Sequence, residues 1–165
     1  MAYSGKYKVK NPKKYLGDHT KVVYRSGWER SCFMWCDAKA DIKGWSSEEV
    51  VIPYYYDVDK KYHRYFMDLK IVFKDGKTLL VEIKPDKQTR IPKNPNKSKR
   101  YISEALTYIK NQCKWEAAKE YAKDRGWHFE IWTEVELRKM GLLAKPVPGK
   151  LKPYKPYKPY ARSKK

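Results

Sequence analysis

The sequence predicts a mixed α/β fold in which helices cover the two faces of a small sheet. Two segments, residues 26–40 and 98–125, begin with a capping residue and carry apolar side chains at helical spacing. Between them, residues 64–73 and 78–84 alternate apolar and polar side chains around a glycine-containing turn, as in a β-hairpin. A hydrophobic fraction of 41% in 165 residues is enough for one domain with a folded core.

The first helix is predicted to begin at Ser26 and to end near Ala40. The residues Ser26-Gly27-Trp28-Glu29 have the capping-box pattern, with a glutamate three residues after the capping serine. Residues 48–56 are predicted to form the first strand. Pro53 places this strand at an edge or makes it irregular, because proline cannot donate a ladder hydrogen bond. The apolar stripe of the helix consists of Trp28, Cys32, Trp35 and Cys36.

The hairpin is predicted to bring two acids and a lysine onto one face. The odd-numbered positions of both strands are apolar, so Asp68, Glu82 and Lys84 share the other face. A three-residue turn at 74–76 pairs Phe73 with Lys77, and therefore Asp68 with Glu82. Two like charges directly opposite are unfavourable, and a divalent cation between them is the simplest reason for the pair. A solvated face that carries two acids is the alternative.

The second half of the chain is predicted to hold a long helix, one strand and a short helix. Residues 85–97 contain three prolines and are expected to be irregular. The long helix begins at Ser98 and stops near Gly126, a strand spans residues 127–133, and a second capping-box pattern at Thr133 opens a helix that stops at Gly141. The expected buried stripe of the long helix is Ile102, Leu106, Ile109 and Cys113.

The net charge of +19 indicates an anionic polymer as partner. The excess lies in residues 1–14, 84–100 and 145–165, and the rest of the chain is neutral. We therefore expect a neutral globule with a basic arm (residues 1–20), a basic loop and a basic tail in which Lys-Pro-Tyr recurs three times. Nucleic acid is the favoured partner; the alternatives are that the charge serves solubility or ribosomal-type electrostatic attachment.

Three cysteines at low density predict neither a disulfide framework nor a zinc site, and they suit a reducing compartment. The sequence has no signal peptide and no apolar run of membrane-spanning length, so we expect a soluble intracellular protein.

Hydrolysis of a phosphodiester needs the residue types that stand at Asp68, Glu82 and Lys84. One or two carboxylates hold Mg²⁺, whose remaining ligands are water and substrate oxygens. A lysine beside the metal orients or deprotonates the water and stabilises developing charge.

Arg64 lies at an even-numbered position like Asp68 and is expected on the same face of its strand, and Lys87, Arg90 and Lys93 follow the second strand. These four residues are expected to contact DNA phosphates, although basic residues on a solvated loop would look the same.

This pattern resembles the PD-(D/E)xK nuclease superfamily. Met67-Asp68 stands where the motif has Pro-Asp, and Glu82-Ile83-Lys84 matches its second half. Longer segments resemble the head completion nucleases of tailed bacteriophages and the N-terminal domain of the Tn7-type transposition endonuclease subunit. The phage resemblance covers most of the chain, the Lys-Pro-Tyr tail excepted. The segments are residues 24–30, 52–54, 63–66, 81–85 and 111–116.

The resemblance implies a restriction-endonuclease-like αβββαβ core, with residues 1–20 as arm, 21–144 as nuclease domain and 145–165 as tail. It implies that Glu29 completes a metal site with Asp68 and Glu82, although Glu29 also fits the capping box. It implies Mg²⁺, with Mn²⁺ as a substitute. Gln112 would contact the scissile phosphate or a water, or is simply a polar residue of the helix.

The implied function is a metal-dependent DNA nuclease, acting as endonuclease or exonuclease, that processes packaged double-stranded DNA in phage head completion and head–tail joining. Portal or neck proteins are implied partners, and neither a membrane nor an organic cofactor is expected. The implied location is the host cytoplasm during assembly, or the virion. The alternatives are a site-specific endonuclease of restriction or transposon type and a non-catalytic DNA-binding neck protein.

Overall fold

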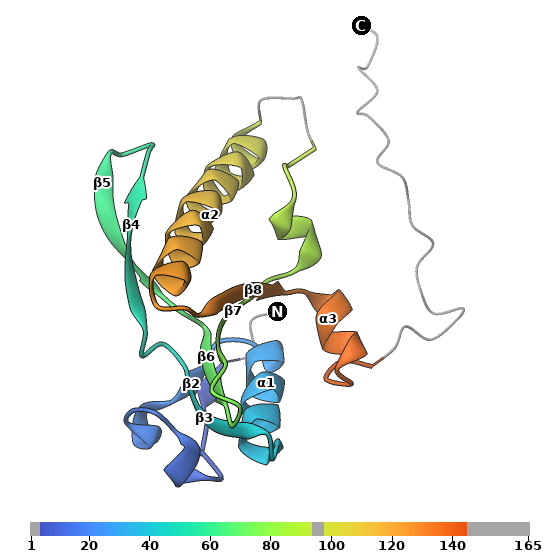
Figure 1. Cartoon of the computed structure of the whole chain (residues 1–165). Coiled ribbons are helices and arrows are strands. Elements are labelled where there is room, and N and C mark those ends of the chain that lie inside the picture. The colour runs from blue at the N-terminus through green and yellow to red at the C-terminus, as the bar shows by residue number, and fades with distance from the viewer. Residues whose placement is uncertain (1–3, 94–97, 145–165) are drawn as a thin grey trace, which may run out of the picture.

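A four-stranded mixed sheet forms the centre of the molecule in the computed structural model, which describes residues 4–93 and 98–144. Its strands lie in the order β3-β6-β7-β8, and only the pairing of β7 with β8 is parallel. Helices α1 and α2 lie on opposite sides of it (Figure 1). The predicted αβββαβ order of helices and strands is present. The bounds are α1 Gly27–Ala38, β3 Ile42–Ser46, β6 Leu69–Phe73, β7 Thr78–Ile83, α2 Lys99–Asp124 and β8 His128–Trp132.

The prediction was wrong about which segment is the first strand of the core. Strand β4 (Val51–Tyr56) pairs only with β5 (Lys61–Phe66), and this separate hairpin lies beside α2 (Figure 1). The first core strand is instead β3, which the sequence pattern hid because it is short and contains Gly44. A Cβ at Gly44 would lie 3.0 Å from side-chain carbons of Leu16, which would have to move by a few tenths of an ångström to accept a larger residue. Pro53 does lie in an edge strand, as predicted.

Residues 64–73 do not form one strand as predicted, because the chain bends at Met67 and Asp68, between β5 and β6. Strands β5 and β6 belong to different sheets, so their odd-numbered side chains pack on opposite sides of the molecule's core. Tyr65 and Met67 pack in the cluster beside α2, whereas Leu69 and Ile71 pack in the cluster beside α1.

The predicted hairpin register is confirmed. Leu69 pairs with Val81, and the Phe73 amide donates to the carbonyl oxygen of Lys77 at 2.8 Å, which closes the three-residue turn. Gly76 in this turn has φ +91°, a conformation that favours glycine. The paired residues end at Leu69, so Asp68 lies one residue beyond the ladder rather than within it.

Two apolar clusters, one on each face of the sheet, form the core. The cluster beside α1 contains Cys32, Phe33, Cys36 and the odd-numbered residues of β7. The cluster beside α2 contains Leu80 of β7 with Trp115, Ala118 and Ala122. All six residues of β7 are consequently buried, which is expected for a strand covered on both faces. The three cysteines are free.

The helix ends follow the capping predictions. Ser26 Oγ accepts a hydrogen bond from the Glu29 amide at 3.2 Å, and Ser98 Oγ accepts from the Tyr101 amide at 3.1 Å. Thr133 forms a full capping box at the start of α3 (Glu134–Lys139). Gly126 and Gly141 have φ +70° and +77° where α2 and α3 stop.

The expected buried stripe of α2 was wrong. Ile102, Leu106 and Ile109 are exposed, and the buried face consists of Asn111, Trp115, Ala118 and Ala122. The N-terminal half of α2 reaches beyond the four-stranded sheet (Figure 1), so the apolar residues there do not pack on that sheet.

Residues 4–20 do not form the extended arm that was expected. They contain β1 (Gly5–Lys6), which pairs with β2 (Val23–Tyr24), and two 3₁₀ turns, η1 (Pro12–Lys14) and η2 (His19–Lys21). Tyr7 is buried and donates to Asp37 at 2.7 Å, and Trp45 donates to the other oxygen of Asp37 at 3.1 Å. The predicted tail, residues 145–165, lies outside the described residues, and the domain boundaries remain predictions. Among the described helices, none has the length and apolar character needed to cross a bilayer.

Candidate active site

The bend between β5 and β6 holds Asp68 against the end of β7. Asp68 Oδ2 accepts a hydrogen bond from the backbone amide of Ile83 at 2.8 Å. The bend itself is fixed by Met67, whose amide donates to the carbonyl of Val50 and whose carbonyl accepts from the amide of Glu48, both at 2.9 Å. The carboxylate of Asp68 is thus tied to the residue between Glu82 and Lys84.

Glu82 is buried within β7, where it is 4% exposed. The hydroxyl of Tyr65 donates a short hydrogen bond to Glu82 Oε2. Lys84 Nζ lies 3.4 Å from Glu82 Oε1, and the backbone amide of Lys84 donates to Trp132 at 3.0 Å, which continues the pairing with β8. One oxygen of Glu82 is therefore held by a phenol and the other by an ammonium group.

Burial and neighbouring carboxylates disfavour the ionised forms of Asp68 and Glu29. Burial raises the pKa of Asp68 well above its ordinary value. Nearby Glu82 and, less strongly, Glu29 raise this pKa further, whereas the Ile83 amide and Lys84 lower it. Burial also raises the pKa of Glu29, and the charges of Glu48 and Glu82 raise it further. The hydrogen bond from the Arg25 amide lowers it. A bound cation would relieve this repulsion.

Glu29 lies at the start of α1 and beside the acids of the hairpin, and its part in a metal site stays a prediction. It occupies the third position of α1, and its Oε2 accepts a hydrogen bond at 2.9 Å from the amide of Arg25, the residue before the Ser26 cap. It is also an electrostatic neighbour of the hairpin acids: Glu29 raises the pKa of Asp68, and Glu82 raises the pKa of Glu29. The hydrogen bond from Arg25 holds the carboxylate at this end of α1, next to the acids of the hairpin.

An ion pair that the sequence analysis missed flanks Glu29. Arg25 Nε lies 2.7 Å from Glu48 Oε1, and both residues are electrostatic neighbours of Glu29. Glu48 has φ +57°, a left-handed conformation that costs about 1–3 kcal/mol in a residue other than glycine. Such strain is found at functional sites, and here it turns the chain toward the bend at Asp68.

The described residues contain no group of three His, Cys, Asp or Glu side chains arranged to hold a metal ion. A hexacoordinate Mg²⁺ needs only one or two protein carboxylates, because water and phosphate oxygens complete its shell. Asp68 and Glu82 supply two such groups at a place where their charges repel. The nearby Cys32 is not a competing soft ligand, since burial raises the pKa of its thiol to about 12. The donor set therefore fits a hard, oxygen-binding cation.

Lys114 of α2 is a further site residue that the sequence analysis did not single out. Its ammonium lies 5.3 Å from the ring centre of Tyr65, and burial lowers its pKa while Glu82 and Asp68 act in the opposite direction. Lys84 and Lys114 thus approach the acids from a strand and from a helix. Lys114 lies one residue before the buried Trp115, and the correct buried face of α2 would have indicated this position.

The predicted DNA-binding residues lie in three parts of the structure. Lys87, Arg90 and Lys93 lie in or after η3 (Asp86–Thr89) and line one cavity with the N-terminal half of α2. Arg64 lies on the β5 hairpin, where its guanidinium is 5.6 Å from the ring centre of Phe66. Gln112 lies on α2, partly exposed, directly after the buried Asn111.

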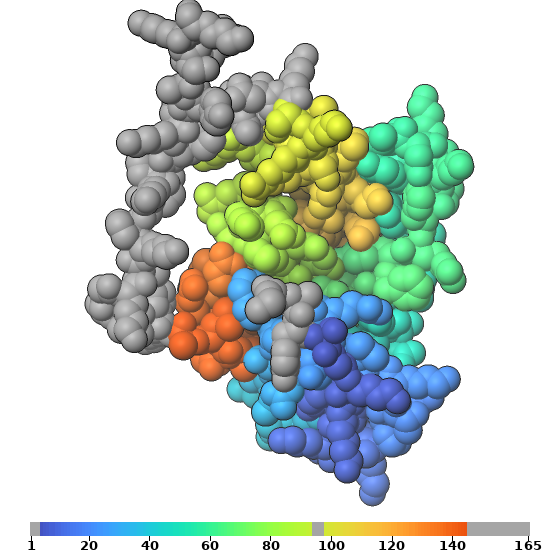
Figure 2. Space-filling view, turned by 180° about the vertical axis from the view of Figure 1, so that it is seen from behind, coloured from blue at the N-terminus to red at the C-terminus, as the bar shows by residue number. Residues whose placement is uncertain are grey.

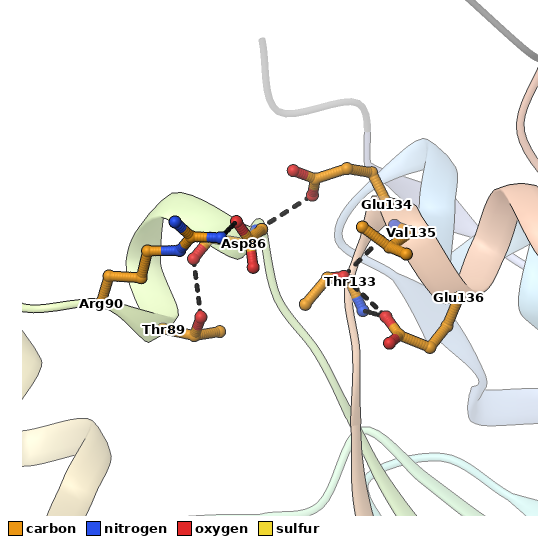
Figure 3. A network of polar contacts seen from close by, with 7 residues as sticks. All are labelled: Asp86, Thr89, Arg90, Thr133, Glu134, Val135 and Glu136. Carbon is orange, nitrogen blue, oxygen red and sulfur yellow. Dashed lines mark hydrogen bonds and ion pairs between the residues drawn. The ribbon is translucent and has the colours of Figure 1, made fainter.

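Polar contacts anchor the loop after Lys84 to the start of α3 (Figure 3). The Asp86 amide donates to Glu134 Oε2 at 3.0 Å, and Arg90 forms an ion pair with Asp86 at 2.7 Å. Thr89 Oγ1 donates to the Asp86 carbonyl at 2.7 Å. The basic loop is thereby held at one position relative to the carboxylates.

Comparison with known proteins identifies the family of the chain. A family model described as TnsA-like endonuclease N terminal matches residues 39–134, which include the bend, β7, Lys84 and Lys114. The chain is 43% identical over 146 residues to the head completion nuclease of Enterobacteria phage T4, covering 86% of this chain and 97% of the phage protein. No solved structure matches. The chain belongs to the family of proteins with a TnsA-like endonuclease N-terminal domain.

Proposed function

We propose that this protein is a metal-dependent DNA nuclease that processes packaged double-stranded DNA during phage head completion and head–tail joining. The convergence of Asp68, Glu82 and Lys84 at the end of β7 carries the proposal. The similarity to a head completion nuclease supports the biological role. Portal or neck proteins would be its partners, in the host cytoplasm during assembly or in the virion.

Asp68 and Glu82, with Glu29 beside them, are the residues that would hold the metal, with Mg²⁺ favoured and Mn²⁺ as a substitute. When bound between these carboxylates and a phosphate, the cation would neutralise phosphate charge and lower the pKa of a water. Tyr65 holds the Glu82 carboxylate in place through its short hydrogen bond.

The two lysines have different tasks in this proposal. Lys84, 3.4 Å from Glu82, is close enough to orient the attacking water or to take a proton from it. Lys114 has a pKa lowered by burial and faces the same acids from α2, so it would stabilise charge that develops on the phosphate oxygens. Both ammonium groups lie partly out of water, where their electrostatic effect is stronger than at the surface.

A plasmid-nicking assay with Mg²⁺ tests the proposal. Wild type should convert closed circles to nicked or linear DNA, whereas Lys84→Ala and Asp68→Ala should not. Lys119→Ala is the matched control, since Lys119 is an exposed lysine of α2. Equal cutting by all four proteins would show that the site is elsewhere. If none of them cuts but all bind DNA, the protein is a non-catalytic neck protein.

The family match also favours a second candidate, a site-specific endonuclease of transposon type. Mapping the cut positions on a sequenced plasmid separates the two. Scattered cuts support the processing nuclease, and a recurring site supports the specific endonuclease. An end-labelled linear duplex with blocked ends then distinguishes internal from terminal cutting.

A further inference from the structure

A cavity of about 600 Å³ lies between the loop that follows Lys84 and the N-terminal half of α2. In Figure 2 the light-green loop and the yellow start of α2 lie against each other on this side of the molecule. The volume is in the range of about 300–1,000 Å³ typical of ligand pockets. None of the residues that line it belongs to the carboxylate pair or its lysines.

Asn111 gives this cavity a buried polar group with nothing to bind. The residue is 4% exposed and lines the cavity, and its Nδ2 has no hydrogen-bond partner among the described residues. A buried donor without a partner destabilises a folded protein. An acceptor atom on a ligand would satisfy this donor.

The rest of the lining combines positive charge, an aromatic ring and apolar surface. Four cations and one carboxylate lie around it, and within the described residues Lys87 and Lys93 form no ion pair. Tyr108 offers a ring, and Ile91 and Pro92 are apolar. Inorganic phosphate would leave the ring and the apolar wall unused, and an apolar molecule would leave the cations unused. A nucleoside monophosphate unit uses all three.

The cavity and the candidate active site share two segments of the chain. Lys87 follows Lys84 by three residues, and Asn111 precedes Lys114 by three residues, which places Asn111 and Lys114 on neighbouring turns of one helix face. A strand with one nucleotide in the cavity would run along these two segments toward Asp68 and Glu82.

We propose that this cavity binds a single unpaired nucleotide, with its base on Tyr108 and hydrogen-bonded by Asn111, and with its phosphate beside Lys87 and Lys93. The source is either the frayed or overhanging end of a DNA substrate or a free mononucleotide. This proposal rests on the proposed function only for the choice of DNA as the polymer. The protein would prefer duplexes with an unpaired end to blunt duplexes.

The test measures binding rather than cleavage, on full-length protein carrying Lys84→Ala in buffer without divalent metal. Fluorescently labelled hairpin DNAs with a blunt end, a 3′ overhang or a 5′ overhang are titrated by anisotropy at fixed salt. At least one overhang should bind roughly ten-fold more tightly than the blunt end, as expected for one base stacked on an aromatic side chain. Adding Tyr108→Ala or Asn111→Leu should abolish this preference, and Ile109→Ala, an exposed position outside the cavity, should keep it.

Thermal unfolding separates binding from structural roles. Asn111→Leu removes a donor without a partner, so its melting temperature should equal or exceed that of the parent. If Asn111→Leu does not fold, Tyr108→Ala alone decides. An overhang preference that survives Tyr108→Ala overturns the proposal, as does equal binding of all three ends with no binding of dAMP or dCMP. Equal binding of the ends, with mononucleotide binding that Tyr108→Ala abolishes, supports the cavity and assigns the free nucleotide as its ligand.

The two proposals fail in different ways. If the Lys84→Ala protein still cuts plasmid with Mg²⁺, the catalytic assignment fails while the binding preference can still be measured. If wild type cuts and the Lys84→Ala protein does not, but that protein binds all three ends alike and binds no mononucleotide, the nuclease stands and the proposal for the cavity fails.

Discussion

The buried pair Glu82–Lys84 provides the sharpest quantitative test, through a double-mutant cycle. Glu82→Gln, Lys84→Met and the double variant remove the charges while keeping side-chain size. The charged atoms are 3.4 Å apart, and the side chains of Glu82 and Lys84 are 6% and 22% exposed. At an effective dielectric constant near 20 the attraction is about 5 kcal/mol, and desolvation of both groups offsets much of it.

We therefore expect a coupling free energy of about 1–3 kcal/mol. Lys84→Met alone should be the more destabilising single change, because it leaves Glu82 buried with only the Tyr65 hydroxyl. A loss of about 2–3 kcal/mol corresponds to a fall of about 4–12 °C in the melting temperature for a chain of this size.

Urea unfolding of the four proteins without metal measures the cycle. The matched control is the pair Glu116–Lys119 on α2, which has nearly the same separation, 3.5 Å, but side chains 71% and 59% exposed. Its coupling should be no more than about 0.5 kcal/mol. In 1 M NaCl the control coupling should vanish while most of the buried coupling remains. If both cycles give the same small value, Lys84 is not held by Glu82, and the geometry argued for the active site is wrong.

Three further predictions concern charge at and around the site. Because the pKa of Asp68 is raised in the folded state, its contribution to stability is complete below the ordinary carboxyl pKa and is lost as the pH rises through the raised value. Metal-free wild type should lose stability relative to Asp68→Asn as the pH rises above about 4, and parallel urea midpoints across the pH series would contradict this. Lys114→Met should lower kcat roughly 100-fold with little change in KM; a KM effect alone would make Lys114 a DNA-binding residue. Deleting residues 145–165, which carry eight basic residues and no acid, should weaken DNA binding and flatten its salt dependence, and an unchanged slope would assign the tail to a protein partner.

Local signals predicted the parts of the fold that depend on near neighbours. The caps at Ser26, Ser98 and Thr133 form as expected because each joins atoms two or three residues apart. The turn ending in Gly76 set the register of β6 and β7, and this register determined that Asp68 and the end of β7 would meet. These contacts need no information from distant parts of the chain.

The errors arose where a residue's environment is made by distant segments. Ile102 and its neighbours have a helical apolar pattern, but α2 extends past the sheet there and they remain exposed. Tyr65 shares its parity with Leu69, yet the bend at Met67 sends the two to opposite sides. Tyr7 and Tyr15 in the N-terminal segment are buried although the segment is rich in lysine.

The sequence by itself determined the helix caps, the hairpin register and the Asp68, Glu82 and Lys84 set, because alternation and turn geometry act over a few residues. Only the tertiary structure decided that β3 is the first core strand and that Tyr65 and Lys114 complete the surroundings of Glu82. It also placed the buried amide of Asn111 at the wall of a basic cavity. These features depend on which face of α2 packs on the sheet, and burial between distant elements sets that face.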